Sequence, residues 1–176
     1  MRTSLVLTVI ADDKPGIVEQ LSDQILEAGA NWEESRMARL AGKFAGLLRV
    51  SIESEHADAL AARLTTFDPS LAVVVERSAD PQGGDVRTVH LELVGNDRPG
   101  IVRDISRALA QHGVNIEELE TETTTAPMSG EALFQARATL RIPSTVTPGQ
   151  LRRDLESLAD ELMVDLSLED ESVARS

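Results

Sequence analysis

The sequence predicts an α+β protein made of two tandem copies of one small unit, each a four-stranded antiparallel sheet with two helices on one face. The segment DDKPGIV at 12–18 returns almost unchanged as NDRPGIV at 96–102, which places Asp13 and Asp97 84 residues apart (97 − 13). Strand and helix periodicities follow each segment in the same order. The length of 176 residues suits one or two domains.

The repeat extends well beyond this turn. At the same offset, AGANWEES at 28–35 aligns with HGVNIEEL at 112–119. The matched residues are Gly29 with Gly113, Asn31 with Asn115, and Glu33 and Glu34 with Glu117 and Glu118. SADPQGGD at 78–85 has the Pro, Gly and polar content of a linker. We therefore predict domains at 1–78 and 86–170, a linker at 79–85 and a solvated tail at 171–176.

In the first copy, SLVLTVIA at 4–11 is a β-rich apolar run. Pro15 then opens a helix, because proline is tolerated in a first helical turn, and Gly29 ends it. The apolar face of this helix consists of Val18, Leu21, Ile25 and Ala28. Two strands follow, NWEESRMARL and KFAGLLRVSIE, the second with Leu48, Val50 and Ile52 alternating with polar residues. HADALAARL is a second helix and LAVVVER a last strand.

The second copy repeats this order. VRTVHLELVG is a strand, and a helix lined by Val102, Ile105 and Leu109 ends at Gly113. VNIEELETETTT is a strand with a polar face, and ALFQARATLRI alternates strictly between apolar and polar residues. A helical stripe of leucines follows, and MVDLSLE closes the copy as a strand; the stripe is Leu151, Leu155, Leu158 and Leu162.

The order β-α-β-β-α-β predicts a ferredoxin-like (βαββαβ) fold in each copy. Both helices then cover the same face of the sheet. The other face must be polar or must be covered by a neighbour. Because uncovered faces and strand edges favour association, we expect a homodimer.

Composition excludes several classes of function. The formal net charge is −13 and no basic stripe is present, so we expect no direct binding of nucleic acid. No apolar run is long enough to span a bilayer, and the absence of cysteine excludes disulfides and thiolate sites. The histidines are isolated, and no catalytic, P-loop or dinucleotide motif occurs. We therefore expect a cytoplasmic protein that is not an enzyme and has no metal or cofactor.

The repeated turn carries a family resemblance. A strand ending in [DN]-[KR]-P-G-I-V, then a helix, then G-x-N at the next strand resembles the ACT domain, a small regulatory module of ferredoxin-like fold. The resemblance covers nearly the whole chain, twice. Two such units with no attached enzyme domain resemble the glycine cleavage system transcriptional repressor family. The resemblance implies a regulatory protein that senses a small amino acid, such as glycine, and acts on a protein partner, with a role in transcriptional regulation of amino-acid metabolism.

The resemblance also implies site residues. In ACT domains that bind amino acids, the ligand commonly lies where the first strand-to-helix turn of one unit meets a neighbouring unit. The residues at the corresponding positions are Asp13, Gly16 and Asn31 in the first copy, and Asp97, Gly100 and Asn115 in the second. Some members carry a histidine two positions before the acidic residue, where this chain has Ala11 and Gly95.

The chemistry of the turn suits an α-amino acid. Free N–H groups at a helix start can accept the ligand's carboxylate, and Gly16 or Gly100 would let it approach closely. Asp13 or Asp97 can face the ammonium group. Asn31 or Asn115 can both donate and accept.

Structural roles remain open for the same residues. Asp13 and Asp97 could instead form a turn or cap the helix, and the asparagines could be loop residues. The glycines are expected to be mainly structural. Glu33 and Glu34 are adjacent, so on a strand they should point to opposite faces. The alternative function is a ligand-free ACT-type module for protein interaction and oligomerisation.

Overall fold

A computed structural model describes residues 1–78, 86–126 and 130–170 of the chain. The chain divides into two compact units, Met1–Pro81 and Gln82–Ser176. The predicted linker 79–85 and tail 171–176 lie outside the described residues, so those boundaries remain predictions. Within the described ranges, no helix is long and apolar enough to cross a membrane.

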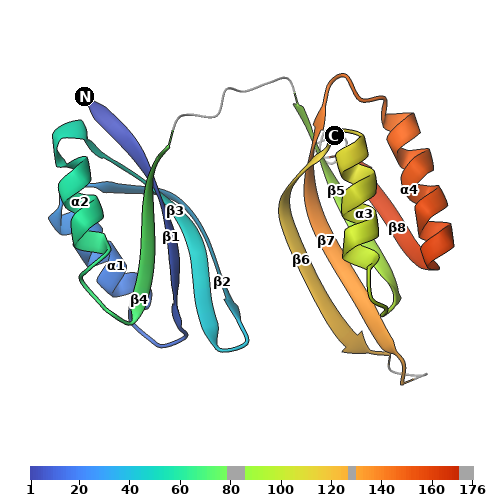
Figure 1. The fold of residues 1–176 in the computed structure, drawn as a ribbon, viewed down its shortest axis with the longest axis horizontal. Coiled ribbons are helices and arrows are strands. Elements are labelled where there is room, and N and C mark those ends of the chain that lie inside the picture. Colours follow the sequence, from blue (N-terminus) through green and yellow to red (C-terminus); the bar gives the residue numbers. More distant parts are fainter. Residues whose placement is uncertain (79–85, 127–129, 171–176) are drawn as a thin grey trace. The chain divides into compact units, whose positions relative to one another are not determined.

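The first unit has the predicted order of elements (Figure 1). Its bounds are β1 Arg2–Asp12, α1 Ile17–Glu27, β2 Asn31–Leu40, β3 Lys43–Glu53, a 3₁₀ turn Ser54–His56, α2 Ala57–Leu64 and β4 Leu71–Ser78. The second unit repeats it with β5 Val86–Asn96, α3 Ile101–Gln111, β6 Asn115–Thr125, β7 Ala132–Pro143, α4 Pro148–Leu162 and β8 Val164–Asp170.

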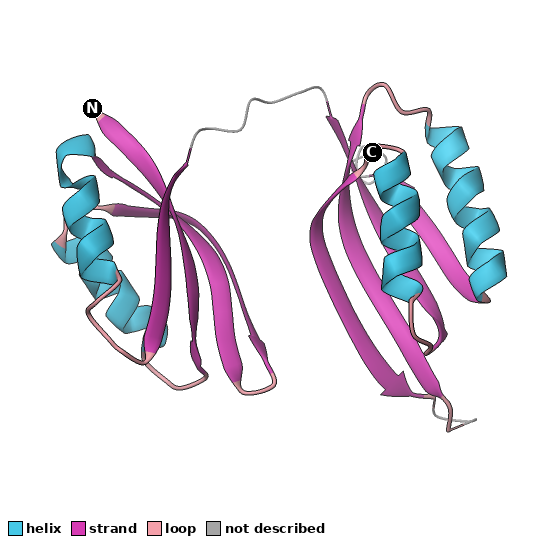
Figure 2. Cartoon of the chain, in the orientation of Figure 1, coloured by secondary structure: helices cyan, strands magenta, loops and turns pink. Residues whose placement is uncertain are grey.

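Each unit contains one antiparallel sheet. The strand orders are β2-β3-β1-β4 and β6-β7-β5-β8, with every neighbouring pair antiparallel. Both helices of a unit lie on the same side of its sheet (Figure 2). The predicted α+β ferredoxin-like fold is therefore confirmed in both halves.

The hydrophobic core of each unit lies between the helices and the covered face of the sheet. In the first unit, Leu48, Val50 and Ile52 of β3 are buried beneath Leu21 and Ile25 of α1 in one cluster. In the second unit, the alternating apolar residues of β7 are buried as predicted: Phe134, Ala136, Ala138, Leu140 and Ile142. Leu151, Leu155 and Leu162 of α4 complete that core, and Leu158 is partly buried against it.

The first helix of each unit starts later than the sequence predicted. Pro15 lies in the turn before α1, which begins at Ile17. Ile17 is therefore on the buried face, and Val18, one helical step of about 100° away, is 46% exposed. Ile101 is likewise buried and Val102 is 41% exposed. The predictions for Pro15, Val18 and Val102 were wrong because the turn residues were counted as helix.

A β-bulge in β2 also changes the directions of the adjacent Glu33 and Glu34 side chains. The register between β2 and β3 shifts between Trp32 and Glu34. Adjacent side chains can then point the same way, and Glu33 and Glu34 both approach Arg49, each with a shortest N–O distance of 3.5 Å. The prediction that the two carboxylates face opposite sides of the sheet was wrong. Trp32 itself packs against the core.

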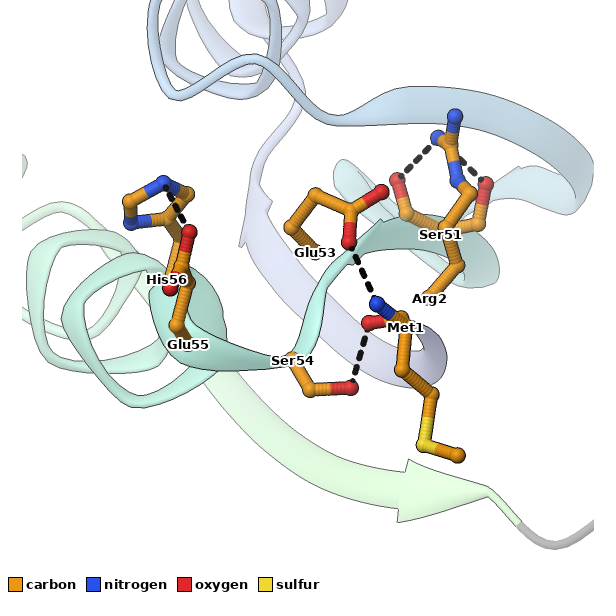
Figure 3. Close-up of polar contacts among 7 residues, drawn as sticks. All are labelled: Met1, Arg2, Ser51, Glu53, Ser54, Glu55 and His56. Atoms are coloured by element: carbon orange, nitrogen blue, oxygen red, sulfur yellow. Dashed lines mark hydrogen bonds and ion pairs between the residues drawn. The ribbon is translucent and has the colours of Figure 1, made fainter.

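The start of β1 is tied to the end of β3 by polar contacts (Figure 3). The α-amino group of Met1 lies 2.9 Å from Glu53 Oε2, and its hydrogen bond and charge hold the pKa of the Glu53 carboxyl below its ordinary value. Arg2 donates to the Ser51 carbonyl and hydroxyl. These contacts hold the start of β1 against the end of β3, and β1 and β3 are the two central strands of the sheet.

The assignment of the helix start can be tested with two neighbouring residues. We expect Ile101→Ala to lower the free energy of unfolding by about 2–5 kcal/mol, because it removes a buried side chain from the core. Val102→Ala should change it by about 0.5 kcal/mol or less, since this side chain is partly exposed. Chemical denaturation measures both. Equal losses for the two variants would contradict the assigned helix start.

Candidate functional site around the strand-to-helix turns

The turn between the first strand and first helix of each unit depends on one glycine. Gly16 and Gly100 are the N-cap residues of α1 and α3, with φ of 92° and 99°. Residues with a Cβ rarely adopt this left-handed conformation. Neither helix start has a side-chain cap. The N–H groups of the first helical turn have no intrahelical partner, so they remain available to an anion.

The predicted alternative that Asp13 and Asp97 cap the helices is therefore wrong. The backbone N–H of Asp13 donates to the Gly42 carbonyl at 2.9 Å, and that of Asp97 to the Ala132 carbonyl at 2.8 Å. Each aspartate is thus held by its main chain against the neighbouring hairpin. Its side chain is left for another role.

In the first unit, the carboxylates of the turn are already engaged. Asp13 Oδ2 lies 2.5 Å from Arg39 Nε of β2. Asp12 is hydrogen-bonded to Lys43, whose ammonium group holds the pKa of the Asp12 carboxyl below its ordinary value. These ion pairs connect the turn to both strands of the β2–β3 hairpin.

In the second unit, the corresponding carboxylate is free. Asp97 is exposed and, within the described part of the chain, its side chain has no hydrogen-bond or ion-pair partner. The chain aligns Thr123 with Arg39, so the cation that pairs with Asp13 is missing here. The two turns have the same backbone conformation, but among the described residues the aspartate carboxylate is ion-paired in the first and not in the second.

A basic residue also lies beside the second helix start. Arg103 Nη2 would be 3.5 Å from a Cβ added at Gly100, so the guanidinium group lies close to the turn. It pairs with Asp104 at 2.9 Å, which raises the pKa of Arg103. At the equivalent place near Gly16, the first unit presents Glu19. Asp104 Oδ2 would lie 3.7 Å from the same Cβ, so the charges beside the second turn offset each other, whereas Glu19 beside the first turn would repel an anion.

The predicted asparagines lie at the other end of each sheet. Asn31 pairs with Ser51, which pairs with Ser4, and Asp12 is eight residues further along β1. At about 3.3 Å per residue, this separates the asparagine from the turn by roughly 26 Å. Asn115 is placed equivalently through Arg141 and Thr88. Neither unit brings its own Asp and Asn together.

The position two residues before Asp97 has no room for a side chain. A Cβ added at Gly95 would lie 2.4 Å from Val164 Cγ1 and 2.9 Å from its Cβ. The histidine found there in some ACT domains would therefore displace β8. Ala11, its counterpart in the first unit, is buried.

Sequence reasoning missed Arg39, Lys43 and Arg103. Arg39 and Lys43 flank the β2–β3 hairpin, and the antiparallel pairing of β1 with β3 places that hairpin beside the turn. Arg103 was detectable, because it lies three residues after Gly100 in the first helical turn. Among the described residues, no group of three or more histidine or acidic side chains is placed to hold a metal ion.

Comparison with known proteins supports the same fold. Models of the ACT domain match residues 3–77 and residues 84–161. A crystal structure of an unknown protein from Galdieria sulphuraria superposes with a TM-score of 0.88 at 32% identity, covering 97% of this chain and 99% of that one.

Two curated proteins are similar in sequence. A UPF0237 protein of Methanopyrus kandleri is 33% identical over 84 residues, which are 48% of this chain and 88% of that protein. The glycine cleavage system transcriptional repressor of Escherichia coli is 24% identical over 161 residues, which are 90% of this chain and 85% of the repressor. With an ACT domain matched in each half, the chain belongs to the ACT-domain family as a tandem ACT protein related to that repressor.

Proposed function

We propose that this protein is a non-enzymatic regulator that binds a small α-amino acid at the turn between β5 and α3. The observation that carries the proposal is the set of free groups at this turn. The uncapped start of α3 offers N–H groups, the charge of Arg103 beside it is balanced by Asp104, and the Asp97 carboxylate has no partner among the described residues.

This arrangement matches the charges of a zwitterion. The ligand's carboxylate would accept hydrogen bonds from the first N–H groups of α3, helped by the helix dipole. Its ammonium group would face Asp97. Gly100 leaves the backbone accessible at this point.

We propose that the first turn is a weaker site. Asp13 would have to leave Arg39 before it could face an ammonium group, and Glu19 would oppose a carboxylate. The two ACT domains would thus have different roles, one receptive and one closed by its own ion pairs.

The predicted asparagines would contact a ligand that is bound at the turn of a second ACT unit. Because Asn115 lies roughly 26 Å from the turn of its own domain, it could complete a site only on a neighbouring unit packed in the opposite direction. A ligand shared by two units would favour one mutual arrangement of them, and this difference in affinity is what regulation requires.

The regulatory output would pass to a protein partner. The net charge of −13 disfavours direct contact with nucleic acid. The name of the Escherichia coli relative makes glycine the first ligand to test, and regulation of genes for amino-acid metabolism the first output to test.

Amino-acid binding can be measured by thermal unfolding with all twenty amino acids. A ligand at about 100 times its Kd should stabilise the folded protein by about 2.7 kcal/mol. Calorimetry is the appropriate readout, because Trp32 reports only on the first domain. We expect Asp97→Asn to abolish the shift, and the matched variant Asp13→Asn to retain most of it.

Three results would contradict this proposal. A shift lost in Asp13→Asn but kept in Asp97→Asn would move the site to the first turn. Equal loss in both variants would show that the turns are equivalent. No shift with any amino acid would favour the ligand-free interaction module instead.

The ion pair between Asp12 and Lys43 at the first turn can be tested through the pKa of the Asp12 carboxyl. We expect Lys43→Met to raise the pKa of the Asp12 carboxyl, because it removes the hydrogen bond and charge that lower it. Since the folded pKa is lowered, the pair stabilises the fold above the ordinary aspartate pKa, and this contribution disappears as the pH falls through the folded value. An NMR titration measures the change, with Asp68, whose pKa is lowered by Ser70, as the unaffected control. An unchanged Asp12 pKa would contradict the ion pair.

A further inference from the structure

The helix-free sheet faces of the two domains differ strongly, although they share one register. We call them the first and second open faces. In the first, two adjacent rows across the sheet contain Arg36, Leu47, Thr8 and Val74, then Ala38, Ala45, Ile10 and Ala72. In the second, the same positions contain Glu120, Arg137, Glu92 and Ser167, then Glu122, Gln135, Val94 and Asp165.

The centre of the first open face is apolar and exposed. Ile10, Leu47 and Val74 are 48%, 53% and 58% exposed. Apolar side chains gathered on one face of a sheet are typical of a surface that becomes covered. At the positions of Leu47, Val74 and Ile10 the second open face has Arg137, Ser167 and Val94. The acidic residues Glu92, Glu120, Glu122 and Asp165 surround them, so this face would remain in water, because burying charged groups is unfavourable.

We propose that the first open face is the surface through which two copies of this chain associate, sheet against sheet about a two-fold axis. Charge favours a second copy as the occupant. Basic and acidic residues nearly balance on this face, with four basic and five acidic residues: Arg2, Arg36, Lys43 and Arg49, and Asp12, Glu33, Glu34, Glu53 and Glu76. A face with a net charge close to zero can meet its own image with little repulsion, whereas the more acidic second open face cannot.

The shape of the face also suits a second copy. The larger side chains Leu47 and Val74 stand in one row. In the next row, about 7 Å further along the strands, Ile10 projects, and the small residues Ala45 and Ala72 leave a recess on either side of it. In a two-fold interface each residue that projects from one copy must find a recess on the other. This face carries both the projections and the recess.

The available area is sufficient for a specific dimer. Four strands about 4.8 Å apart and about ten residues long, at about 3.3 Å per residue, present roughly 600 Å² on one face. Two such faces in contact bury about 1,200 Å², which is at the lower end of specific protein interfaces.

The surface can be tested by exchanging residues between the domains. Ala38→Glu with Ala72→Asp introduces the residues that the second sheet already carries as Glu122 and Asp165, so the fold should accept them. In sedimentation equilibrium of the full chain, we expect a wild-type dimer and a rise in its dissociation constant of about 100-fold or more, because like charges would face each other. The matched control, Glu122→Ala with Asp165→Ala, should dimerise like the wild type.

Cross-linking provides a test that does not depend on a destabilised variant. The chain contains no cysteine, so a single one can be introduced on either open face. Ala45→Cys lies on a central strand of the first face and should form a disulfide-linked dimer on mild oxidation. Gln135→Cys, at the equivalent place on the second face, should not. A monomeric wild-type chain, an unaffected Ala38→Glu/Ala72→Asp dimer, or cross-linking of Gln135→Cys alone would each overturn the proposal.

Discussion

A single backbone conformation, the left-handed glycine at Gly16 and Gly100, sets the geometry of each domain. The glycine closes the turn after the first strand, the helix starts one residue later, and Ile17 or Ile101 is buried in the core. It also leaves the helix start without a side-chain cap. The same constraint that directs packing therefore leaves free N–H groups at the surface, which explains why one chain contains the segment DKPGIV and then DRPGIV.

The turns of the two domains share one backbone conformation but differ in the charged side chains around it. Asp13 is neutralised by Arg39, and Glu19 lies beside the glycine. In the second domain Arg103 and Asp104 lie beside the glycine as an ion pair, and Asp97 has no ion pair among the described residues. Duplication preserved the fold, because the fold depends on the turn and the core. It left the exposed charges of each turn and each open face free to diverge, so a receptive domain and an assembly domain could arise from one unit.

The sequence predicted the fold because its signals are local and occur twice. The strict alternation in β7 and the glycines that end the helices were enough to assign the order of elements. The helix starts were misplaced because Pro15 is compatible with either a turn or a first helical turn. The bulge after Trp32 has no local signal, since it depends on the pairing of β2 with β3. The ion pair of Asp13 with Arg39 likewise joins residues brought together only by the folded sheet.

Amino-acid sensing by this protein requires that an amino acid binds at the start of α3. Adding glycine to ¹⁵N-labelled protein while recording amide chemical shifts would test it most directly. We expect the largest shifts at the amides of Gly100, Ile101, Val102 and Arg103, with smaller shifts at Gly16 and its neighbours. Shifts confined to the turn of the first domain, or to the open sheet faces, would contradict the account.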